Sequence, residues 1–163
     1  MNERTRLFVS RLAAWTAITT LIAIQPASPA AADDRLVVPR NDTWKAECSA
    51  CHLAYPPQLL PARSWRAIVQ GLDKHFGTDA SLDPMTAKEV QAFLEQHAGR
   101  DRGGPEASAP MRITDTGWFR REHRKIPAAT WAHPDVGSRA NCPACHRAAE
   151  RGDFDEHTVR LPR

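Results

Sequence analysis

Apolar residues recur at helical spacing in residues 61–76 (PARSWRAIVQGLDKHF). Positions three and four residues apart share one side of an α-helix, so the pattern predicts a helix here. The expected face consists of Trp65, Ile68, Val69, Leu72 and Phe76. His75 follows Leu72 by three positions and falls on the same face.

Two further helices are predicted, each with a start signal. Asp83 is a good N-cap and Pro84 suits the first helical position; the stripe that follows consists of Val90, Phe93, Leu94 and His97. Thr116 can cap a helix over about residues 117–126 (GWFRREHRKI), where Phe119, His123 and Ile126 align.

Strand signals are weak, and residues 36–38 are the best short candidate. We therefore expect a mainly α fold with long loops. Residues 99–110 (GRDRGGPEASAP) lack apolar periodicity and are typical of a linker. This linker separates two small lobes, residues 33–98 and 111–163. The second lobe is too short to form a strong apolar core of its own.

The N-terminus has the pattern of a secretory signal peptide. A basic start precedes an uncharged apolar run at residues 12–24 and a small-residue exit ending at Ala32. The run is shorter than the roughly 20 residues of a spanning helix, although an uncleaved anchor is the alternative. We expect residues 1–32 to be removed and the mature protein to work in the periplasm, an oxidising compartment.

Composition gives no sign of a nucleic-acid-binding protein. The chain has 163 residues, 25% of them charged, and a net charge of +3. Residues 1–32 contribute three arginines against one glutamate, so residues 33–163 carry only +1. Nucleic-acid-binding domains need a clustered basic excess that this balance lacks.

The four cysteines form two Cys-x-x-Cys-His motifs, Cys48-Ser49-Ala50-Cys51-His52 and Cys142-Pro143-Ala144-Cys145-His146. This is the attachment signature of a c-type haem. Two thiols one helical turn apart reach the two vinyl groups of a porphyrin and form thioethers. The adjacent histidine, His52 or His146, then binds the iron. We expect two covalently attached haems.

Other uses of paired cysteines fit less well. An exported chain with four cysteines would normally form two disulfides, but then neither motif would need its histidine. The pairs lie about 90 residues apart, against about 15–20 in zinc ribbons. A thioredoxin-like site needs a βαβ context that this chain lacks.

The sixth ligand of the first haem iron should come from the remaining histidines. We favour His75, because the apolar face that carries it suits a haem. His97 and Met85 are the alternatives, with Met85 expected to pack in the first turn of its helix.

For the second haem we favour His123, and His133 is the alternative. His133 precedes Pro134, so it should occupy an extended or turn segment. His157 lies in the polar tail and should be exposed.

Four basic residues flank His123: Arg120, Arg121, Arg124 and Lys125. They form either a solvated face or a surface for haem propionates or an acidic partner.

The chain resembles the small dihaem cytochrome c family over most of the expected mature sequence. The resemblance is carried by CSACH, SWRAIVQGLDKHFGTDASLD, ITDTGWFRREHRKIP and WAHPDVGSRANCPACHRAAERGDFDE. It implies a first lobe similar to class I cytochrome c and two bis-histidine, low-spin irons. By position, His75 in HFG and His123 in REHRKI match the second ligands.

The resemblance also implies a role as an electron carrier rather than an enzyme. The expected acceptor is a soluble, oxygen-binding monohaem cytochrome c, and the expected donor is a membrane cytochrome b or the quinone pool. A small peroxidase-like enzyme or gas-binding protein with one open iron is the alternative, and an assembly subunit is a third. No nucleophile–base constellation or phosphate loop indicates other chemistry.

Overall fold

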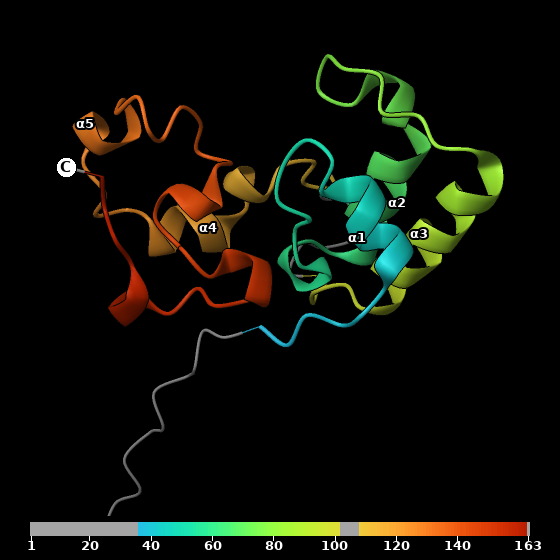
Figure 1. The fold of residues 1–163 in the computed structure, drawn as a ribbon, viewed down its shortest axis with the longest axis horizontal. Coiled ribbons are helices and arrows are strands. Elements are labelled where there is room, and N and C mark those ends of the chain that lie inside the picture. Colours follow the sequence, from blue (N-terminus) through green and yellow to red (C-terminus); the bar gives the residue numbers. More distant parts are fainter. Residues whose placement is uncertain (1–35, 102–107, 163) are drawn as a thin grey trace, which may run out of the picture. The chain divides into compact units, whose positions relative to one another are not determined.

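The computed structural model describes residues 36–101 and 108–162, so the predicted export signal and the middle of the predicted linker lie outside the described residues. These described residues form the α-helices labelled in Figure 1, which are α1 Asp42–Cys48, α2 Ala62–Gln70, α3 Pro84–Gln96, α4 Gly117–Glu122 and α5 Ala128–Trp131. Short 3-10 turns connect them. The described residues contain no β-strand, only isolated bridges such as those between Pro61 and Gly99 and between His75 and Thr78. The mainly α fold class is confirmed.

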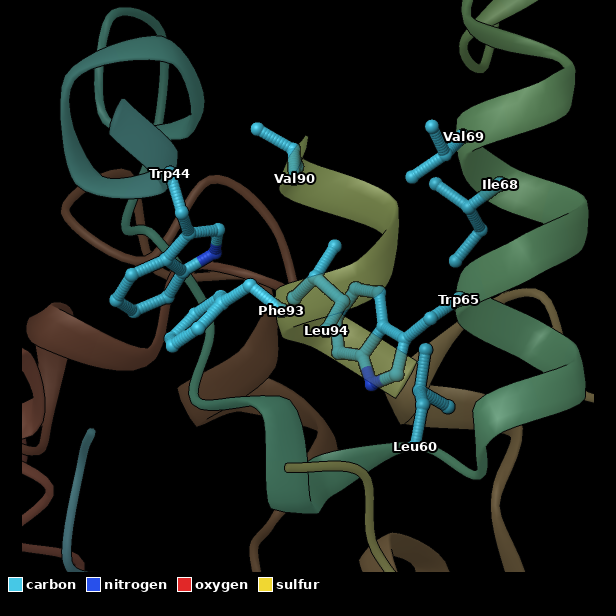
Figure 2. Close-up of a cluster of buried hydrophobic side chains, with 8 residues drawn as sticks. All are labelled: Trp44, Leu60, Trp65, Ile68, Val69, Val90, Phe93 and Leu94. Atoms are coloured by element: carbon cyan, nitrogen blue, oxygen red, sulfur yellow. The ribbon is translucent and has the colours of Figure 1, made fainter. Parts of the chain in front are cut away.

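A compact apolar core lies among α1, α2 and α3. Helices α2 and α3 pack side by side, and Trp44 of α1 meets Phe93 of α3 with ring centroids 5.1 Å apart. Figure 2 shows the buried cluster, which consists of Trp44, Leu60, Trp65, Ile68, Val69, Val90, Phe93 and Leu94. The first half therefore has a protein core that fixes its helices.

Two of the predicted helix starts are confirmed. The Asp83 side chain accepts hydrogen bonds from the backbone N–H groups of Met85 and Thr86. The Thr116 hydroxyl accepts from the N–H of Phe119 at 3.1 Å. Each cap satisfies amides that have no partner inside their helix.

The helix predicted over residues 61–76 is too long. Helix α2 ends at Gln70, and Gly71, a poor helix former, leads into a separate 3-10 turn at Leu72–Lys74. Phe76 has a positive φ of 51° and is 47% exposed. Phe76 therefore does not lie on the buried apolar face on which the spacing places it.

Three smaller expectations are also wrong. Residues 36–38 form no strand; the Leu36 N–H donates to the carbonyl of Gly152 instead. Met85 is 77% exposed and does not pack, because it lies away from the apolar stripe of α3. Helix α4 ends at Glu122, so Ile126 follows it in a turn.

The second half buries few apolar side chains. Among its described residues, the buried hydrophobic ones are Phe119, Val136 and Ala149. Turns and short 3-10 segments carry the rest of the backbone. Within residues 36–101 and 108–162, the helices are all too short or too polar to cross a membrane.

Candidate functional site: two histidine pairs

The first Cys-x-x-Cys-His motif begins where α1 ends. Cys48 is the last residue of that helix, and Cys51 and His52 lie in the turn that follows. The Nδ1 atom of His52 is 2.8 Å from the carbonyl oxygen of Leu53, which it reaches as a donor. The opposite ring nitrogen of His52 is therefore the one free to bind a metal.

His75 lies next to His52 although the predicted helix does not extend to it. It follows the 3-10 turn Leu72–Lys74, and its carbonyl accepts from the N–H of Thr78. The positive φ angles of Phe76 and Gly77, 51° and 101°, reverse the chain there. The His75 ring centroid lies 6.1 Å from that of His52, with planes inclined by 27°.

The second motif is wound into a single turn. Cys142–Ala144 is a 3-10 turn, and the N–H of His146 donates to the carbonyl of Cys142 at 2.8 Å. The Nδ1 atom of His146 is buried and has no hydrogen-bond partner. Burial lowers the pKa of His146, with His123 nearby adding to the effect.

His123 is positioned by the end of α4. Its backbone N–H and its ring Nδ1 both donate to the carbonyl of Phe119, each at 3.0 Å. Its ring stacks on that of Phe119 at 4.0 Å and 19°. The ring centroid of His123 lies 6.1 Å from that of His146, with planes inclined by 76°.

Both histidine pairs fit a metal shared between two imidazoles. Bonds from transition metals to imidazole nitrogen are about 2 Å long, which places the centroids of two such rings about 6 Å apart. The observed separation is 6.1 Å in each pair. In one imidazole of each pair, His75 and His146, desolvation lowers the pKa and so favours the neutral form that binds metal.

A family model for dihaem cytochrome c matches residues 44–154, which is more than half of the chain and includes both motifs and both histidine pairs. The chain belongs to the dihaem cytochrome c family. A diheme cytochrome c from Rhodobacter sphaeroides is 39% identical, with a TM-score of 0.67, over 73% of this chain and 100% of that one. The diheme cytochrome type c from Shewanella baltica OS155 is 44% identical, with a TM-score of 0.68, over 77% and 95%. No curated protein matches the chain.

As a dihaem cytochrome c, the protein carries two covalently attached c-type haems and is of the electron-transfer type. The four cysteines that attach them are free of disulfides here. Burial raises the pKa of the Cys48 and Cys142 thiols to about 11. Nucleophilic and redox-active cysteines have lowered pKa values instead, so these thiols are unsuited to thioredoxin-like chemistry.

An open cavity of about 320 Å³ lies beside His123 in this cytochrome. Phe119, Trp131 and Ile126 supply apolar walls, and Arg120, Arg124 and Arg139 supply charge; His123 and Ala128 complete the lining. An aromatic wall with arginines at its margin suits a planar apolar ring that carries carboxylates. Of the predicted basic cluster, Arg121 pairs with Glu122 rather than lining this cavity.

The alternative ligands take part in other contacts. The His97 ring packs against Phe93 at 5.0 Å. The Nδ1 atom of His133 accepts from the backbone N–H of Asp135 at 3.2 Å. His157 is exposed, as the sequence predicted, and its Nδ1 lies 2.8 Å from the Asp155 carboxylate. His75 and His123 remain the assignments that the geometry favours.

Tyr55 is a site residue that the sequence interpretation missed. Its ring stacks on that of His52 at 4.9 Å, and its hydroxyl donates to the carbonyl of Ala140 at 2.7 Å. It is the only tyrosine in the chain and follows His52 by three positions, which is a local signal. Its contact with Ala140, 85 positions away, has no such signal.

Proposed function

We propose that this cytochrome is a periplasmic electron carrier in which both irons have two histidine ligands. His52 and His75 hold the first iron, and His146 and His123 hold the second. Cys48, Cys51, Cys142 and Cys145 attach the two porphyrins as thioethers.

The paired histidines carry this proposal. Each motif histidine has a partner imidazole at 6.1 Å, which supports a second histidine ligand for each iron. A haem held in this way provides one-electron oxidation and reduction, with a lower potential than a His/Met haem. With two histidines holding each iron, the irons would have no open position for a substrate or a gas, which favours an electron carrier over an enzyme.

The partners follow from the family resemblance. Electrons would arrive from a membrane cytochrome b or the quinone pool and leave to a soluble monohaem cytochrome c. The apolar run at residues 12–24, with its basic start and small-residue exit, supports export. The exposed side chains of Arg120 and Arg121 offer a positive surface near the second site.

Electron exchange with a soluble acceptor tests the proposal. Reduced holoprotein is mixed with an oxidised, oxygen-binding monohaem cytochrome c, and the second-order rate constant is followed at increasing ionic strength. We expect fast transfer that slows with salt and with Arg120→Glu or Arg121→Glu. Lys88→Glu, an exposed charge change on α3 of the first half, is the matched control and should have a smaller effect.

Two outcomes would count against parts of the proposal. A rate independent of salt and of both arginines would make the basic residues a solvated face only. Tight binding of carbon monoxide to the reduced holoprotein would instead favour the peroxidase-like or gas-binding alternative.

A further inference from the structure

Tyr55 connects the two motifs of the cytochrome. Its ring lies against the imidazole of His52, the metal-binding histidine of the first motif. Its hydroxyl reaches the carbonyl of Ala140, two positions before Cys142 of the second motif. One side chain therefore contacts both haem-attachment segments.

The backbone around Tyr55 is restricted by its neighbours. Pro56 and Pro57 follow it, and both are fully buried. A residue before proline is confined to extended conformations, so the tyrosine backbone has little freedom. An ordinary tyrosine has a pKa of about 10, so the hydroxyl keeps its proton and remains a donor at neutral pH.

Few contacts set the plane of the His52 ring. The residue is exposed; besides Tyr55, its ring faces that of His75 at 6.1 Å, and its Nδ1 donates one hydrogen bond to the carbonyl of Leu53. A single hydrogen bond leaves the imidazole free to rock about that bond, whereas a ring stacked on its face restricts the rotation. The corresponding support for His123 comes from Phe119.

We propose that Tyr55 is a positioning residue with two separable actions: its ring fixes the imidazole plane of His52, and its hydroxyl holds the second attachment segment against the first site. The proposal rests on the bis-histidine assignment of the first iron given above. It adds a named residue that keeps the two redox centres in one fixed arrangement.

Electron paramagnetic resonance of the ferric holoprotein tests the action of the ring. The planes of the His52 and His75 rings are inclined by only 27°. When two imidazole ligands are nearly parallel, both raise the energy of the same iron d orbital above that of its partner, and the ferric iron gives a rhombic low-spin signal. The first-site signal is identified as the one that His75→Ala removes. We expect Tyr55→Leu to shift or broaden it and to leave the second-site signal in place, while Tyr55→Phe, which keeps the ring, restores the wild-type line.

Amide hydrogen exchange of the holoprotein tests the action of the hydroxyl. Loss of one net hydrogen bond should speed exchange of the amides at residues 141–142 and 144–146 roughly two- to tenfold in Tyr55→Phe. Amides in α3 should be unaffected and serve as the internal control.

The outcomes separate this proposal from the proposed function. An unchanged first-site signal in Tyr55→Leu would remove the orienting role, and unchanged exchange at residues 141–142 and 144–146 in Tyr55→Phe would remove the holding role. In both cases wild-type protein with two low-spin irons leaves the proposed function intact. A high-spin first iron in the wild type would overturn the ligand assignment itself.

Discussion

The imidazole rings of His123 and His146 are nearly perpendicular, at 76°, whereas the equally spaced rings of His52 and His75 are inclined by only 27°. The difference arises from local supports. Phe119 stacks on His123 and accepts its Nδ1–H, while Tyr55 stacks on His52. The two histidine pairs thus have the same ring separation but different angles between their planes, which makes them distinguishable by experiment.

Removing a second ligand should open one iron at a time. We expect His75→Ala and His123→Ala each to bind one carbon monoxide per reduced molecule, measured by the Soret band, and the wild type to bind none. His97→Ala and His133→Ala are the matched controls, because these rings contact Phe93 and the Asp135 amide instead. A His75 or His123 variant that stays fully low spin would show that its assignment is wrong.

Loss of both haems should unfold much of the protein. The described second half buries only Phe119, Val136 and Ala149 as hydrophobic residues, and small metal-dependent domains often fold only with their metal. A variant with all four cysteines changed to alanine should lose the ordered structure of the second half and cooperative melting of the whole, while α1, α2 and α3, which share a buried apolar cluster, keep part of the helical circular dichroism. Native-like helix with cooperative melting in that variant would contradict the expectation.

Gly152 should tolerate alanine less well than Gly137. Both have positive φ, 77° and 63°, which costs a side-chain-bearing residue roughly 1–2 kcal/mol. A Cβ on Gly152 would also lie 2.0 Å from the carbonyl oxygen of Leu36, whereas one on Gly137 meets nothing closer than 3.8 Å. Denaturant unfolding of the holoproteins should show the larger loss for Gly152→Ala; equal losses would mean that Leu36 is not held against Gly152.

The cap of α3 should add a pH dependence to stability. A hydrogen bond from the Thr86 side chain, followed by those from the Thr86 and Met85 amides, holds the pKa of Asp83 below its ordinary value. A lowered folded pKa stabilises the protein above the unfolded pKa of about 3.9, and the effect is lost as pH falls through the folded pKa.

Thermal unfolding of holoprotein checks this contribution. Asp83→Ala should melt below the wild type at pH 7, and the difference should shrink as the pH falls through the folded pKa. Asp83→Asn, which keeps a capping oxygen without charge, should lie between them. A difference that stays constant with pH would assign the effect to packing rather than to the carboxylate.

Local signals in the sequence were sufficient for the helix starts and for the attachment motifs. Asp83 and Thr116 cap the helices they precede, because capping depends on residues two or three positions away. The haem-attachment motif Cys-x-x-Cys-His is likewise local, because all the residues that define it lie within five positions. His75 and His123 were chosen from apolar periodicity, and both lie beside the motif histidines.

Features set by tertiary contacts were not predictable in this way. The spacing of apolar residues predicts that α2 continues to Phe76, but the helix ends before Gly71. The guanidinium carbon of Arg112 lies 4.0 Å from the centroid of the Phe76 ring and covers it instead. Residues 36–38 have strand-like composition, but their backbone pairs with single distant residues: Leu36 with Gly152, 116 positions away, and Val37 with the side chain of Gln58. The contact between Tyr55 and Ala140 is of the same kind, since nothing local to either residue specifies the other.

Electron paramagnetic resonance of the oxidised wild-type holoprotein tests bis-histidine ligation of both irons most directly. We expect two low-spin signals and no high-spin component: one rhombic signal from the near-parallel pair of His52 and His75, and one strongly anisotropic signal from the near-perpendicular pair of His123 and His146. A high-spin signal that accounts for one iron per molecule would contradict the account, because it would mean that one iron lacks its second histidine ligand.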